Sequence, residues 1–239
     1  MRYFPVFVDL KGKYCVVVGG GRVGERKVRS LLKAGALVKV IGPELTPSLF
    51  RLKKKGKIIH ISRSYRTGDL GRAFLVIAAT DDRKTNERVF RQALEKRVLV
   101  NVVDDPAHSS FIVPSIVEKK DLVVAISTSG RSPALARVLR QKLEKEIGPE
   151  YTFLLKILGS LRKKIRSLKL GQKENQKIFR ELVKEELLSL IKEKKFQEVN
   201  HRLKTILGSG FSLRELGLRW QKSQGRDGNG RILKNEGAG

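Results

Sequence analysis

Residues 13–34 constrain the fold more than any other part of this 239-residue chain. The apolar, β-branched run KYCVVV at 13–18 is typical of a strand buried on both faces. It ends at the sequence GGGRVG at 19–24, and residues 23–34 then carry apolar side chains at helical spacing. A glycine-rich turn between a strand and a helix predicts the first βα turn of a dinucleotide-binding unit.

Each glycine of this G-x-G-x-x-G pattern has a distinct expected role. Gly19 permits the tight turn, Gly21 lets the backbone approach a pyrophosphate, and Gly24 lets the helix pack on the strand. The alternative is an ordinary turn without a ligand. The flanking strand and helix favour the cofactor site.

Strand-like and helical segments alternate as far as residue 103. This order predicts an α/β fold with a Rossmann-like doubly wound parallel sheet, which we assign to an NAD-binding domain at 1–112. Further strands are expected at 37–41, 57–62, 73–79 and 98–103, and helices at 46–55 and 84–96.

The pattern changes after Pro106. Residues 111–128 predict two apolar strands around a polar turn at 118–121, and residues 132–147 predict an amphipathic helix with Pro133 in its first turn. This small α+β segment, 113–148, is too small for a core of its own. It would be buried against a second copy of itself, which predicts a homodimer.

The remaining residues divide into a helical domain and a tail. Residues 149–207 are helical in pattern, with breaks at Gly171 and near Lys194. We expect disorder in the Gly-rich, polar tail at 208–239. Four apolar residues could nevertheless form one short docking helix: Leu213, Leu216, Leu218 and Trp220.

Composition excludes several classes of protein. A single cysteine and three histidines allow no internal disulfide and no structural zinc set, and we expect no permanent metal site. No apolar run approaches the ~20 residues of a membrane span, and the start has no secretory pattern. A cytoplasmic location without membrane contact is the expectation.

The formal net charge of +27 concerns partners more than fold. The excess is spread over both halves of the chain. The densest basic run, at 161–169, holds no aromatic residue for base stacking, which favours a solvated helix face over a nucleic-acid site. A third interpretation is a basic surface that attracts a small polyanionic substrate.

The choice between NAD and NADP stays open, with NAD preferred. The acidic residue expected at the end of the second strand is missing, because Gly42 and Pro43 follow it, but Glu44 could reach a ribose from the loop. No Arg or Lys lies within 41–47 to hold a 2′-phosphate.

The carboxyl end of the strand at 73–79 should also border the cofactor. Ligands bind outside the carboxyl ends of the strands in open α/β sheets, so Thr80 and Asp81 are expected there. The alternative for Asp81 or Asp82 is a cap on the following helix.

Several motifs in one order resemble a known family. The chain is similar, over residues 1–145, to the precorrin-2 dehydrogenase and sirohydrochlorin ferrochelatase family, the amino-terminal module of siroheme synthase, in its stand-alone form. The motifs that carry the resemblance are PVFVDLKGK near the start, GGGRVGERK at 19–27, AATDD at 78–82, NVVDDP…SSFIVPSIV at 101–117 and STSGRSPALARVLR at 127–140.

The resemblance implies an activity. It is the NAD-dependent oxidation of precorrin-2 to sirohydrochlorin, followed in bifunctional members by insertion of ferrous iron, a substrate, to give siroheme. The carboxylate-rich tetrapyrrole would account for a basic cleft, with Arg131 among its candidate residues.

The resemblance also implies site residues. They comprise cofactor contacts on two loops, one catalytic aspartate and a Ser-rich loop at the substrate. In this chain they are Arg22 and Val23, Pro43 and Glu44, Asp104, and Ser127, Thr128 and Ser129.

The chemistry of Asp104 can be argued without the family. Asp104 follows a buried strand at the sheet edge where a nicotinamide would point, so its carboxylate could accept a proton as hydride leaves the substrate, or the pyrrole protons during metal insertion. Asp105 is interpreted as an ordinary turn residue. His108 is a secondary candidate, as a second base or an iron guide, with an exposed loop histidine as the alternative.

Two other functions remain open at this point. The chain could be a dehydrogenase without chelatase activity, or a non-catalytic Rossmann protein that senses NAD or binds nucleic acid. The residue that separates these alternatives is Asp104, because a sensor has no need of it.

Overall fold

The computed structural model describes residues 3–166 and 171–220 and divides the chain into two units. The first comprises the residues up to Pro114 together with Ser127–Ser132, and the second comprises Ser115–Ile126 and the residues from Pro133 onward. The hairpin therefore falls in one unit with the later helices, whereas the sequence pattern predicts two separate segments, 113–148 and 149–207.

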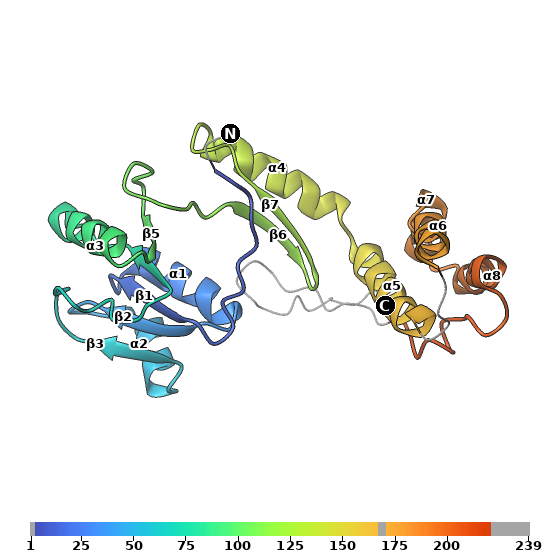
Figure 1. Cartoon of the computed structure of the whole chain (residues 1–239), viewed down its shortest axis with the longest axis horizontal. Helices are drawn as coiled ribbons and strands as arrows, with labels where there is room; N and C mark the ends of the chain where they lie inside the picture. Colours follow the sequence, from blue (N-terminus) through green and yellow to red (C-terminus); the bar gives the residue numbers. More distant parts are fainter. Residues whose placement is uncertain (1–2, 167–170, 221–239) are drawn as a thin grey trace, which may run out of the picture. The chain divides into compact units, whose positions relative to one another are not determined.

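The first unit is built on a five-stranded, wholly parallel sheet (Figure 1). The strand order β3-β2-β1-β4-β5 confirms the predicted Rossmann-like topology, with the order reversing between β1 and β4. The strands are β1 (Tyr14–Val18), β2 (Leu37–Ile41), β3 (Ile58–Ile61), β4 (Leu75–Ala78) and β5 (Leu99–Val102).

Helices cover both faces of this sheet, as a doubly wound fold requires. The helices are α1 (Arg22–Lys33), α2 (Pro47–Lys54) and α3 (Arg83–Glu95). Alternate residues of β1 face opposite sides: Val17 packs in one core with Val28 of α1, and Val16 packs in the other with Val89 of α3. This two-sided burial explains why the strand is apolar without alternation.

Two serine side chains cover the outer edge of β5. The Ser110 hydroxyl accepts a hydrogen bond from the Val100 N–H (2.9 Å), and the Ser109 hydroxyl accepts one from the Val102 N–H (2.9 Å). Ser109 and Ser110 thus satisfy backbone donors that an exposed edge strand would leave without partners.

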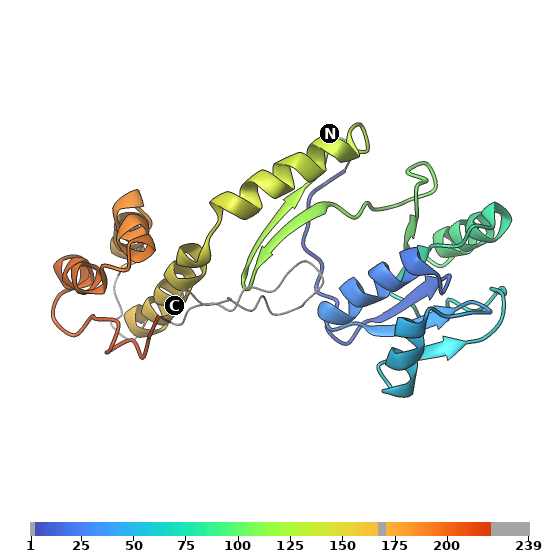
Figure 2. The same cartoon turned by 180° about the vertical axis from the view of Figure 1, so that it is seen from behind.

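The second unit begins with an antiparallel hairpin, β6 (Ser115–Lys119) and β7 (Leu122–Ile126), in register from Ser115↔Ile126 to Lys119↔Leu122. Helix α4 (Pro133–Glu146) packs against the hairpin, mainly on β6 (Figure 2). Lys120, in the two-residue turn, takes a left-handed conformation (φ 58°).

Four further helices form the core of the second unit. They are α5 (Pro149–Arg166), α6 (Gln172–Leu182), α7 (Glu185–Lys192) and α8 (Phe196–Leu207). Ile157, Leu161, Leu187 and Leu203 are buried together at its centre. The predicted break near Lys194 is present, and another, between α6 and α7, was not predicted.

The predicted disorder from residue 208 is wrong for residues 208–220. Phe211 and Leu213 are buried in the helical core, and the Trp220 ring lies edge-on to Phe153 at 5.1 Å. The Leu213 N–H donates to Asn200 Oδ1 (2.8 Å), and the segment is made of turns instead of the suggested docking helix. Apolar burial outweighs the polar composition here. The rest of the predicted tail, 221–239, lies outside the described residues.

Across the described ranges, no helix is both long and apolar enough to cross a membrane.

Candidate functional site

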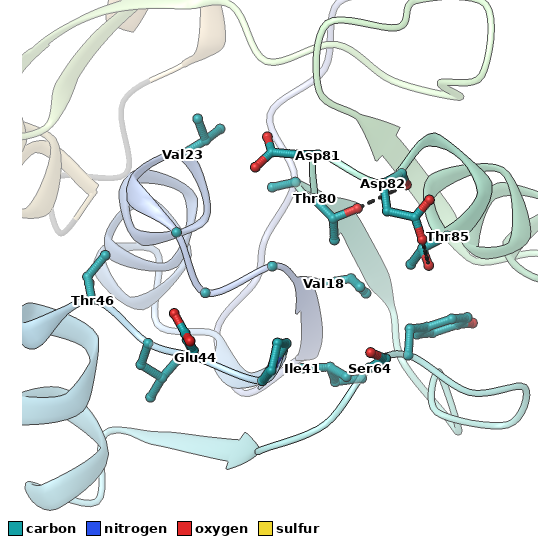
Figure 3. Close-up of a pocket in the computed structure, with 18 of the residues that line it drawn as sticks. Val18, Val23, Ile41, Glu44, Thr46, Ser64, Thr80, Asp81, Asp82 and Thr85 are labelled. Carbon is teal, nitrogen blue, oxygen red and sulfur yellow. Dashed lines mark hydrogen bonds between the residues drawn. The ribbon is translucent and has the colours of Figure 1, made fainter.

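A pocket of about 570 Å³ opens at the carboxyl edge of the parallel sheet, beside the switch point between β1 and β4. Figure 3 shows Glu44 on one side of the glycine loop and Thr80 with Asp81 on the other. Its walls come from the loops after the first four strands: residues 18–23, 41–46, 64–65 and 79–82 with Thr85.

The glycine loop is held by three close backbone approaches. Gly19 has φ 113°, and a Cβ there would lie 2.3 Å from the Ala79 carbonyl oxygen. A Cβ on Gly20 would lie 2.0 Å from the Glu44 carbonyl oxygen, and one on Gly24 would lie 2.1 Å from the Gly19 carbonyl oxygen. The turn therefore excludes side chains at these positions.

Gly21 differs, because a Cβ there would have no neighbour within 4 Å. It is the N-cap of α1, with no side chain capping the helix. Its backbone lines the pocket, where the amide groups of the first helical turn are available to an anion. This open backbone fits the pyrophosphate of a dinucleotide.

The loop after β2 is tied to α1 through Thr46. The Thr46 N–H donates to the Gly20 carbonyl oxygen (3.0 Å), and its hydroxyl donates to Glu25 Oε2 (2.6 Å). Burial acts to raise the pKa of Glu25, but hydrogen bonds from Thr46, Arg29 and Ser48 outweigh it, and the pKa is lowered. Glu25 thus fixes the loop as an ionised acceptor.

Pro43 and Glu44 are exposed in this loop and line the pocket, as do Arg22 and Val23 at the start of α1. Arg22 is the one basic residue among the lining residues. Glu44 follows the end of β2 by three residues and lines the pocket, consistent with its candidate role toward a ribose.

The two aspartates in the loop after β4 have different surroundings. Asp82 is the N-cap of α3 and accepts hydrogen bonds from the Lys84 N–H (3.0 Å) and the Thr85 hydroxyl (2.6 Å). The Thr85 bond lowers the pKa of Asp82. Asp81 is exposed beside the pocket (Figure 3). The sequence left open which of the two caps the following helix, and the structure shows that Asp82 caps α3.

Thr80 is held by Asn86 of α3. Its hydroxyl donates to Asn86 Oδ1 (2.9 Å), and the Asn86 amide donates back to the Thr80 carbonyl oxygen (2.9 Å). This reciprocal pair fixes the wall of the pocket. Asn86 had no signal in the sequence beyond its place in a helix.

The loop after β3 contributes Ser64 and Tyr65, which sequence reasoning missed. Tyr65 is buried and donates a hydrogen bond to Gln92, and burial raises its pKa to about 12. Arg63 holds this loop by a bidentate pair with Asp69, both N–O distances being 2.7 Å. The sequence between β3 and β4 has no motif that would have shown this.

Asp104 follows β5 in a left-handed conformation (φ 59°) and is exposed. It does not line the pocket, but β5 is next to β4, so both strands end at the same edge of the sheet. The Lys27 ammonium of α1 interacts electrostatically with Asp104. Burial and the nearby Arg26 lower the pKa of Lys27, and the Asp104 carboxylate partly offsets this shift.

Asp105 and His108 form a pair in the same turn. The Nδ1 atom of His108 lies 2.7 Å from Asp105 Oδ2, and the His108 N–H donates to Asp105 Oδ1 (3.2 Å). The His108 hydrogen bond lowers the pKa of Asp105.

The segment Ser127–Ser132 belongs to the same unit as this turn, and a Cβ on Gly130 would lie 4.0 Å from Pro106 Cγ. The Ser127 hydroxyl accepts from the Ser129 N–H (3.0 Å), and the Thr128 hydroxyl accepts from the Ser132 N–H (3.1 Å). These hydroxyls shape the loop, and the Arg131 side chain is exposed.

Cys15, His60 and His201 do not line the pocket. Cys15 is buried in β1, and His60 Nε2 lies 2.8 Å from the Gly42 carbonyl oxygen. His201 is exposed on α8. Over the described residues, no three side chains of His, Cys, Asp or Glu come together as a metal-binding group.

Comparisons with known proteins agree with this architecture. Residues 6–115 match a family model described as "Putative NAD(P)-binding", and residues 120–146 match one described as "Sirohaem biosynthesis protein central". A siroheme synthase of Photorhabdus laumondii is 37% identical over 218 residues, 91% of this chain and 46% of that protein. Siroheme synthase 1 of Serratia proteamaculans is 44% identical over 166 residues, 70% of this chain and 35% of that protein.

The solved structure of SirC, a precorrin-2 dehydrogenase, matches with a TM-score of 0.71 and 25% identity, covering 83% of this chain and all of SirC. The chain belongs to the precorrin-2 dehydrogenase and siroheme synthase family. The resemblance seen in the sequence is therefore confirmed. This family member spans less than half the length of the curated siroheme synthases it matches.

Proposed function

We propose that the chain oxidises precorrin-2 to sirohydrochlorin with NAD as the hydride acceptor. The observation that carries this proposal is the match to SirC, because all of that precorrin-2 dehydrogenase is covered by this chain. The pocket at the switch point of the sheet and the exposed aspartate at the same edge are consistent with it.

The glycine loop would bind the dinucleotide. The open backbone at Gly21 and the first amides of α1 receive the pyrophosphate, and the Glu44 carboxylate accepts hydrogen bonds from a ribose. NAD is preferred over NADP, because no Arg or Lys between residues 41 and 47 could hold a 2′-phosphate. When bound, the nicotinamide ring supplies the hydride acceptor.

Asp104 would accept the proton that the substrate loses. The oxidation removes a hydride and a proton, and only the hydride leaves with the cofactor. Asp104 is exposed at the edge of the sheet that carries the pocket, and no hydrogen bond from the described residues occupies its carboxylate. The Lys27 side chain of α1 is close enough to interact electrostatically with it.

The loop that follows β7 would meet the substrate. It lies against the turn that carries Asp104, through Gly130 and Pro106. Its exposed Arg131 can pair with a carboxylate of the tetrapyrrole, while Ser127, Thr128 and Ser129 hold the loop in shape.

The test is an anaerobic assay with precorrin-2 generated in situ and NAD supplied, followed by NADH absorbance and by the spectrum of sirohydrochlorin. Asp104→Ala is the matched variant. We expect NADH from the wild type and none from the variant, with NAD binding equal in both. Absence of NADH from a wild-type chain that binds NAD would contradict the proposal and favour an NAD sensor. Salt-dependent binding of duplex DNA would favour the nucleic-acid alternative.

Ferrous iron insertion is a second candidate activity. It is favoured by the siroheme synthase match, which extends over 91% of this chain. Asp104 could accept the pyrrole protons that the iron replaces. Ferrous iron added after the oxidation is complete should then change the spectrum faster than in an enzyme-free control. Equal rates would show that the chain catalyses the oxidation but not the iron insertion.

We also propose a homodimer built on the hairpin. An isolated two-stranded sheet is marginal in water and relies on packing against other elements. Helix α4 packs on this one, yet Ile116 and Val123 stay 42% and 37% exposed. A second copy of the same hairpin offers the same apolar surface. Light scattering should give a molecular mass of twice the chain for the wild type and of one chain for Ile116→Glu. A monomeric wild type would contradict the dimer.

A further inference from the structure

The turn after β5 carries two consecutive carboxylates in different surroundings. Asp104, with φ 59°, is exposed, and no hydrogen bond among the described residues reaches its side chain. Asp105 turns back onto the chain, where both of its oxygens contact His108. The proposed oxidation uses Asp104 and leaves this second carboxylate without a role.

The Asp105 contacts exceed what a turn needs. Oδ1 accepts the His108 N–H (3.2 Å), which alone would make the turn. Oδ2 lies 2.7 Å from the ring atom Nδ1. An ionised carboxylate only accepts hydrogen bonds, so a hydrogen bond at this distance requires the proton on Nδ1.

The imidazole of His108 is also fixed in plane. Phe90 of α3 meets it edge-on, with ring centroids 4.9 Å apart at 84°. No hydrogen bond within the described residues involves Nε2, and the side chain is 43% exposed. In the neutral ring, Nε2 is then the nitrogen with a free lone pair.

We propose that Asp105 is a positioning residue that holds His108 in the Nδ1–H tautomer, so that Nε2 relays the proton received by Asp104. This inference rests on the proposed dehydrogenase function. The hydride goes to NAD, the substrate proton goes to the Asp104 carboxylate, then to Nε2 and then to water. Asp104 is thereby ionised again for the next turnover.

The first test reads the tautomer and needs no activity. In the full chain with ¹⁵N-labelled histidine, the ring shifts of His108 should report Nδ1–H, with His108→Gln assigning the signal. His60 is an internal control of opposite sense, since its Nε2 lies 2.8 Å from a carbonyl oxygen. Asp105→Asn keeps an acceptor for the turn but presents an amide donor to Nδ1, so His108 should change to Nε2–H. A wild-type Nε2–H ring would overturn the proposal.

The second test separates the relay from a merely structural role. Asp105→Asn should lower kcat about 100-fold, the scale of a general acid–base contribution, with the KM for NAD and the melting temperature unchanged. His108→Gln should lower kcat equally, and the double variant no further. If Asp105→Asn had the wild-type kcat, the proton relay would be wrong, while the proposed oxidation would stand. An inactive wild type would overturn the proposed function, while the tautomer measurement would still decide whether Asp105 orients His108.

Discussion

Gly24 of α1 faces the carbonyl oxygen of Gly19 so closely that a Cβ on Gly24 would lie 2.1 Å from it. The carbonyl belongs to the turn itself and cannot rotate away without moving the loop. We therefore expect Gly24→Ala to destabilise the chain by about 1–3 kcal/mol, the usual cost of overpacking, and to weaken NAD binding as well. Urea unfolding and a fluorescence titration with NAD measure the two effects. Unchanged stability would show that the loop can relax.

Gly21→Ala is the matched comparison, because Gly21 has an ordinary φ of −75° and open space around its Cβ position. Its stability should stay within about 0.5 kcal/mol of the wild type. NAD affinity should nevertheless fall, since the methyl group occupies the approach of the pyrophosphate. If NAD bound equally well, the pyrophosphate would not lie over Gly21.

Asp104→Asn isolates the charge of Asp104 from its backbone. Asparagine tolerates the left-handed conformation that Asp104 adopts (φ 59°), so the turn should persist. We expect NADH formation to fall by about 100-fold or more, with NAD affinity and melting temperature retained. Wild-type turnover in this variant would remove Asp104 from the chemistry.

Cys15 should be inert in the folded chain. It is 1% exposed, and burial raises its pKa to about 11, so the thiol stays protonated at neutral pH. Iodoacetamide should label it slowly at pH 8 and quickly in denaturant. Because the folded pKa is above the unfolded value, its stabilising contribution is present below the unfolded pKa and is lost as pH rises toward 11. Cys15→Ala should lack that component of alkaline destabilisation.

Asp69 predicts an effect at the other end of the pH scale. The hydrogen bond from Arg63 lowers the pKa of Asp69, which binds fewer protons folded than unfolded. Its stabilising contribution is present above the unfolded pKa and is lost as pH falls through the folded pKa. Melting temperatures from pH 7 down to pH 3 should therefore fall more steeply for the wild type than for Asp69→Asn. Parallel curves would show that the pair contributes nothing.

The features predictable from sequence are those set by neighbouring residues. The uninterrupted apolar run ending at Val18 indicates two-sided burial, and the order of strands and helices indicates a parallel sheet. Both are found, because local pattern and global fold agree. Asp104 is likewise placed at the sheet edge by its position just after a strand.

The features that could not be predicted depend on contacts distant in the sequence. Gly20 is required by the Glu44 carbonyl oxygen, 24 residues away, and Ser110 satisfies a backbone donor ten residues earlier. The segment at 208–220 has a polar composition, yet Leu213 is buried in a hydrophobic core formed with residues of α5, α7 and α8. Composition cannot report a surface that exists only after folding.

The path of the chain has a consequence for synthesis. Ser127–Ser132 belongs to the first unit, although the residues on both sides of it belong to the second, so the backbone changes unit three times between Pro114 and Pro133. During translation, the first unit stays incomplete until the hairpin of the second has left the ribosome. A single break in the gene at either boundary of the hairpin would therefore deliver a first unit that lacks Ser127–Ser132.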